Sequence, residues 1–74
     1  MFMEENRPID ALNNSKGKRV LLRLKNGTEI SGTLKAQDLH LNMWLTDVEL
    51  KKDEETTKYK DMLVRGDTVL YIIL

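Results

Sequence analysis

A chain of 74 residues and 8.6 kDa has room for one small domain, which we expect to span residues 1–74. Twelve Lys and Arg balance twelve Asp and Glu, so bulk charge excludes a strongly basic nucleic-acid surface and an acidic disordered tail. The absence of Cys and the single His exclude disulfides, a thiol nucleophile and thiolate or His-rich metal sites, and we expect no cofactor.

Hydropathy points to a soluble, cytoplasmic chain. The longest apolar run, residues 69–74, is far too short to span a bilayer, which needs about 20 residues. Residues 1–5 lack the positive stretch that opens a signal peptide. A core this small rarely stabilises a fold by more than a few kcal/mol, so a small domain usually needs a further source of stability. Because the composition excludes disulfides and thiolate metal sites, we expect oligomerisation to provide it.

Charge is unevenly distributed along the chain. Six cations against one Glu give residues 15–35 a net charge of +5, while residues 1–14 carry −2 and residues 36–50 carry −3. The basic stretch 16–25 is most simply the solvated face of a strand, with nonspecific RNA contact as the alternative.

The first predicted element is a short helix over residues 8–14. Pro8 suits a first helical turn, Ile9 and Leu12 share one face, and the polar residues up to Gly17 end the helix.

Two strands and a hairpin turn follow. Apolar residues alternate from Arg19, and Asn26-Gly27 predicts a type I′ turn, in which both central residues have positive φ. The return strand covers residues 28–36, with Gly32 on its core face, where a missing side chain lets a sheet bend.

The next apolar alternation predicts a third strand over residues 41–50, with Leu39 and Leu41 on the core face together with Met43 and Leu45. A charged turn over residues 51–57 leads to a fourth strand that ends at Val64.

The last strand, Thr68 to Leu74, is apolar on both faces. It follows Arg65-Gly66-Asp67, a predicted tight turn in which Gly66 supplies positive φ. A strand that is apolar on both faces must be buried on both, so we expect one face to meet another subunit. The elements together predict a mainly β fold, a short N-terminal helix followed by a strongly bent five-stranded antiparallel barrel over residues 18–74.

Catalysis is not expected. His40 is the single imidazole, neither Ser15 nor Ser31 lies in a nucleophile-elbow context, and no Gly-rich phosphate loop opens a helix.

Two short polar turns carry the most informative side chains, which are Asp38, His40 and Asn42 in one and Arg65, Gly66 and Asp67 in the other. An imidazole and a guanidinium are flat surfaces on which an unstacked base can lie, each such stack contributing about 1–3 kcal/mol. An Asn carboxamide offers a donor and an acceptor that match a pyrimidine edge, an acidic side chain can orient it, and a Gly lets a ligand approach the backbone. These turns predict single-stranded RNA bound one base per pocket.

Simpler interpretations stay open for each residue. His40 fits an exposed strand position, Asn42 could hydrogen-bond its own turn, and Arg-Gly-Asp is a common turn tripeptide. Trp44, the only Trp, suits packing or a subunit interface.

In this order the residues resemble the Sm/LSm family, with coverage from about Arg7 to Ile73. Two signatures carry the resemblance, supported by the helix opening Arg7-Pro8-Ile9-Asp10 and the hairpin Lys25-Asn26-Gly27. The first signature comprises Gly32, Leu34, Asp38, His40, Asn42, Leu45 and Asp47, and the second Val64, Arg65, Gly66, Asp67, Val69 and Ile72. The short connector between them is most similar to archaeal Sm-like proteins. Gln37, Trp44 and Thr68 depart from the usual family pattern.

The resemblance implies a ring, usually of seven identical subunits, in which the last strand of one subunit pairs with the fourth strand of the next. It implies U-rich single-stranded RNA at the pore and a role in RNA processing or metabolism. His40 and Arg65 would sandwich a uracil whose edge Asn42 reads, Asp38 would hold Asn42, and Gly66 and Asp67 would complete the rim. The alternative is a ring-forming protein scaffold with weak or no specific RNA binding.

Overall fold

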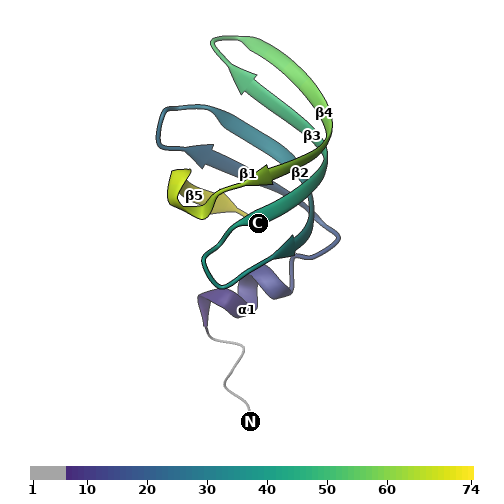
Figure 1. The fold of residues 1–74 in the computed structure, drawn as a ribbon, viewed down its shortest axis with the longest axis vertical. Coiled ribbons are helices and arrows are strands. Elements are labelled where there is room, and N and C mark those ends of the chain that lie inside the picture. Colours follow the sequence, from purple (N-terminus) through teal and green to yellow (C-terminus); the bar gives the residue numbers. More distant parts are fainter. Residues whose placement is uncertain (1–6) are drawn as a thin grey trace.

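The computed structural model describes residues 7–74, so the predictions for residues 1–6, including the signal-peptide exclusion, lie outside the described residues. The elements, shown in Figure 1, are α1 (Pro8–Asn13), β1 (Arg19–Leu24), β2 (Glu29–Gln37), β3 (Met43–Lys52), β4 (Glu55–Val64), the one-turn 3-10 helix η2 (Gly66–Thr68) and β5 (Val69–Ile73). The predicted order of one short helix and five strands is confirmed. In residues 7–74, no helix is long and apolar enough to cross a membrane.

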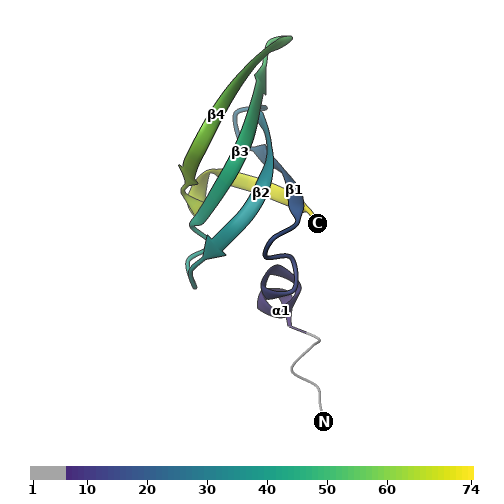
Figure 2. The same cartoon turned by 90° about the vertical axis from the view of Figure 1, so that its right-hand side faces the viewer.

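The five antiparallel strands form one strongly bent sheet, which confirms the predicted fold class, although β4 and β5 do not pair with each other and the sheet is open. All pairings are antiparallel and the strand order is β4-β3-β2-β1-β5, so β4 and β5 are the two outer strands. Figure 2 shows the sheet curling until β5 crosses behind the long strands. Each outer strand therefore presents an edge to which another chain could add.

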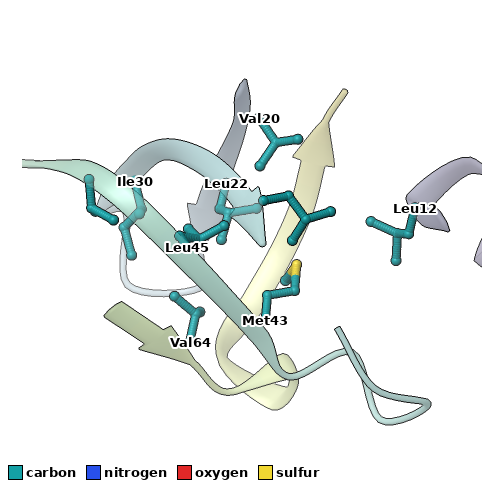
Figure 3. Packing of buried hydrophobic residues seen from close by; sticks show 9 residues of the cluster. Leu12, Val20, Leu22, Ile30, Met43, Leu45 and Val64 are labelled. Carbon is teal, nitrogen blue, oxygen red and sulfur yellow. The ribbon is translucent and has the colours of Figure 1, made fainter. Parts of the chain in front are cut away.

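A single apolar core fills the concave side of the bent sheet (Figure 3). Leu12 reaches this core from α1 and so attaches the helix to one end of the sheet. The buried members are Leu12, Val20, Leu22, Ile30, Leu34, Met43, Leu45, Val48 and Val64.

The bend is located where β2 and β3 change register. Ser31 pairs with Glu49 but Thr33 pairs with Thr46, so β3 carries one extra residue at this point. Asp47 has a φ of +52°, and this bulge lets Leu45 and Val48 both face the core although they are three residues apart. A Cβ on Gly32 would lie 3.2 Å from the Thr46 carbonyl oxygen and from Val48 Cγ2, so Gly32 packs tightly on the core face as predicted.

The first hairpin turn lies where predicted but has a different conformation. Gly27, with a φ of +91°, has positive φ and Asn26 does not, so the turn is not type I′. The Leu24 carbonyl accepts the Gly27 N–H at 2.9 Å, and the Asn26 side-chain oxygen accepts the Thr28 N–H at 3.0 Å. In a type I′ turn Asn26 would also have positive φ. Here its side chain closes the turn instead, by accepting the Thr28 N–H.

Leu39 and Leu41 do not lie in the core as the alternation predicts, because they are 86% and 40% exposed. β3 begins only at Met43, and Leu41 has a φ of +64°. Residues 38–42 form a loop rather than the start of the strand, because the Asp38 side chain accepts the backbone N–H groups of His40 and Asn42. A local side-chain contact thus overrides the apolar alternation.

The charged segment 51–57 is mostly strand rather than turn. β3 and β4 pair as far as Lys52 and Glu55, which leaves Asp53 and Glu54 as a two-residue turn with φ values of +53° and +68°. This is the left-handed geometry that a tight hairpin requires, formed here by two acidic side chains rather than by Asn-Gly.

Replacing Glu54 with Gly is expected to stabilise the protein by about 0.5–1 kcal/mol, because only Gly adopts positive φ without a steric cost. The midpoint of urea unfolding should therefore rise. Glu55→Gly is the matched control at the first residue of β4, where an added Gly should lower the midpoint. Equal shifts in both variants would contradict this account of the turn.

Candidate nucleic-acid interface

The two polar turns of the sequence meet at one end of the sheet. The loop 38–42 joins β2 to β3, and Arg65 with η2 joins β4 to β5. A Cβ on Gly66 would lie 2.2 Å from the His40 carbonyl oxygen and 2.8 Å from the Leu41 carbonyl carbon. Gly66 does not have the predicted positive φ. It is required instead because the two backbones touch at this position.

Asp38 organises the first turn. Its Oδ1 accepts the backbone N–H groups of His40 and Asn42, both at 2.9 Å, and its Oδ2 accepts the Asn42 side-chain Nδ2–H at 3.0 Å. The pKa of the Asp38 carboxyl lies below its ordinary value, first because of the hydrogen bond from the Asn42 side chain and second because of the Asn42 backbone N–H. Desolvation opposes this lowering, and the His40 backbone N–H adds a smaller contribution to it. Asp38 thus holds Asn42 in place.

The orientation of the Asn42 amide is fixed by two partners that cannot exchange roles. Asp38 can only accept and so takes an N–H of Nδ2, whereas the Gly66 backbone N–H can only donate and points to Oδ1 at 2.9 Å. Each contact uses half of the capacity of its atom. One N–H and one oxygen lone pair of the amide remain for a ligand, side by side, as a pyrimidine edge requires.

His40 and Arg65 supply the flat surfaces around this amide. Both are exposed, and the Arg65 side chain, 78% exposed, contacts the Asp67 carboxylate at 3.3 Å. A hollow of about 460 Å³ is lined by five of the six predicted site residues, while Asp38 orients Asn42 from its own turn. The five are His40, Asn42, Arg65, Gly66 and Asp67.

Two supporting residues were not anticipated in these roles. Thr68 closes the second turn, since its hydroxyl donates to the Arg65 carbonyl at 2.7 Å and its N–H donates to the same oxygen at 3.1 Å. The spacing of a Thr three residues after Arg65 is a signal that could have indicated this turn. Gln37 donates to the Asn13 side chain and so links β2 to the end of α1. Residues 7–74 contain no cluster of His, Cys, Asp or Glu able to hold a metal ion.

The Asp38 contacts predict a distinct acid response of this loop. A lowered pKa in the folded protein means that the Asp38 contribution is fully present above the unfolded value of about 3.9 and is lost as the pH falls through the lower folded value. The backbone and side-chain amide NMR signals of Asn42 should therefore stay constant from pH 5 to pH 4 and move together below that. Asp38→Asn should abolish this shared transition. A transition above the ordinary pKa of an Asp would contradict the assignment.

Residues 10–74 match the family model described as the LSM domain. The chain belongs to the LSM domain family. The Sm/LSm resemblance of the sequence is thereby confirmed over nearly the whole chain.

Relatives of this LSM-domain chain are archaeal. A Thermococcus kodakarensis protein named as an snRNP Sm-like protein is 46% identical over 65 residues, which cover 86% of each chain. A Pyrococcus abyssi Sm protein, solved in complex with a uridine heptamer, is 42% identical with a TM-score of 0.86, over 92% of this chain and 97% of that one. P. aerophilum SmAP1, solved as a heptamer, is 39% identical with a TM-score of 0.85 over 89% of each chain.

Proposed function

We propose that this protein is a cytoplasmic, non-enzymatic LSM-domain subunit that forms a homo-oligomeric ring, of seven copies, and binds U-rich single-stranded RNA at the pore. As a single domain it would act in RNA processing or metabolism. The observation that carries the proposal is the convergence of two flat cationic or aromatic side chains, His40 and Arg65, on an amide with one free donor and one free acceptor.

The base would lie between the imidazole of His40 and the guanidinium of Arg65, with its edge against Asn42. Stacking supplies affinity that does not depend on base identity, so selectivity has to come from the amide. Uracil presents a carbonyl acceptor beside the N3–H donor, and these complement the two groups that Asn42 leaves free. The uridine heptamer bound by the P. abyssi relative supports uracil as the preferred base.

Assembly is supported by the two open edges of the sheet. β5 carries Leu70, Tyr71 and Ile73 exposed on an outer strand, and β4 is the outer strand at the other end. An exposed apolar edge strand is a template for pairing with another chain, and pairing β5 with β4 of the next copy would cover both edges. A heptameric relative supports a closed ring of seven.

Two measurements test the proposal. The mass of the protein in solution should be seven times the subunit mass. Labelled U-rich RNA should bind more tightly than A-rich RNA of equal length at fixed salt. A stable monomer would refute the ring. Equal weak binding of both RNAs that vanishes with added salt would instead support the scaffold alternative, because phosphate contact alone behaves in this way.

A further inference from the structure

A second hollow adjoins the candidate base pocket. It has a volume of about 420 Å³ and shares Asn42 and Arg65 with the base pocket. Its apolar lining comes from Ala36, Trp44 and Leu63 on three neighbouring strands, with Leu63 directly opposite Trp44 in the pairing of β3 and β4. RNA that leaves the base pocket past Asn42 and Arg65 would meet this hollow next.

Trp44 is held in one orientation while its ring stays accessible. The indole Nε1–H donates to the Asp61 carboxylate at 3.0 Å, so the polar edge of the ring is occupied. The side chain is nevertheless 43% exposed. Lys35 Nζ lies over the ring, 5.6 Å from its centroid, and the hollow that Trp44 lines is formed without Lys35.

We propose that Trp44 is a second stacking position, which takes the base of a nucleotide next to the one held by His40 and Arg65. This inference rests on the proposed function and extends it from one contacted base per subunit to two. Trp offers the largest aromatic surface among the side chains, and stacking on it tolerates any base.

The charges around the ring fit a nucleotide better than an apolar protein segment. Lys35 lies over the indole and Arg65 lines the hollow, so both cations can face phosphates of the bound strand. Two carboxylates lie nearby, but Asp61 accepts the indole N–H and Asp38 accepts three hydrogen bonds. A second copy of this chain is the competing occupant, since Leu63 is 73% exposed on the outer strand β4.

The first experiment uses the fluorescence of Trp44, which is the only tryptophan in each subunit of the assembled protein. Acrylamide should quench its fluorescence in the RNA-free assembly, and a uridine heptamer should both quench the emission and shield the ring from acrylamide. Shielding before RNA is added would mean that a second copy covers Trp44 and would overturn the proposal.

The second experiment measures heptamer affinity by fluorescence anisotropy of labelled RNA. Trp44→Leu should weaken binding about fivefold or more, while Trp44→Phe, which loses the Asp61 contact but keeps an aromatic face, should bind close to the parent. Tyr59→Leu removes a similarly exposed aromatic from β4 outside both hollows and should leave the affinity unchanged, with mass in solution verifying that this outer-strand variant still assembles. Parent-like affinity of Trp44→Leu would overturn the proposal and leave the His40 and Arg65 pocket intact, whereas failure of the parent to bind the heptamer would refute the proposed function itself.

Discussion

Arg65→Ala is expected to weaken binding of a uridine heptamer by about tenfold or more, and His40→Ala by a similar factor. Each variant removes one of the two flat surfaces that would enclose a base, and a single base stack is worth about 1–3 kcal/mol. The fold should persist, because both side chains are exposed and lie outside the apolar core. Anisotropy of labelled RNA measures the affinity, and mass in solution checks that assembly is unchanged.

Arg19→Ala is the matched control for this prediction. It removes the same type of cation, exposed at the start of β1 and outside the candidate base pocket. Parent-like binding by Arg19→Ala would also argue against RNA contact through Arg19 in the basic stretch 16–25. If Arg65→Ala and His40→Ala both bind the heptamer as the parent does, the pocket assignment is wrong.

Gly66→Ala is expected to abolish heptamer binding and to destabilise the protein by about 3 kcal/mol or more. The added Cβ would lie 2.2 Å from the His40 carbonyl oxygen, and a backbone atom cannot rotate away as a side chain can. Relief requires the loop 38–42 to separate from η2, which breaks the contact from the Gly66 N–H to Asn42. Urea unfolding and RNA anisotropy measure the two effects.

Gly17→Ala separates this overlap from a general cost of replacing glycine. Gly17 has a φ of +83° with open space around its Cβ position, so the substitution should cost about 1 kcal/mol and leave RNA binding unchanged. A Gly66→Ala variant that is no less stable than Gly17→Ala would show that the two turns are not in contact.

The elements that follow from local pattern could be predicted from the sequence. Alternation predicts β1 and β2, and Gly32 marks the bend. The doubly apolar last strand predicts a face that meets another subunit, and in the single chain Leu70, Tyr71 and Ile73 of β5 are exposed. The candidate site residues were predicted from residue type and family signature, and the structure brings Asp38, Asn42 and Gly66 into one hydrogen-bonded unit.

Features that depend on distant contacts or on side-chain capping could not be predicted from the local sequence pattern. Leu39 and Leu41 fit the alternation of a strand, yet Asp38 caps their segment into a loop. Gly66 is required because of the backbone of His40 and Leu41, 26 and 25 residues earlier in the chain, rather than because of its own φ. The open sheet also follows from long-range geometry, since no local pattern states whether β4 and β5 pair with each other.

The double restraint on the Asn42 amide has a thermodynamic consequence for recognition. Its rotamer freedom is given up when the chain folds, so no conformational entropy is lost at Asn42 when a base arrives. His40 and Arg65 are exposed and must still be ordered by the ligand. In the proposed pocket the edge-reading group would therefore be rigid while the stacking groups adapt, so a base with the wrong edge would leave Asn42 unpaired and could not be accommodated by rearrangement.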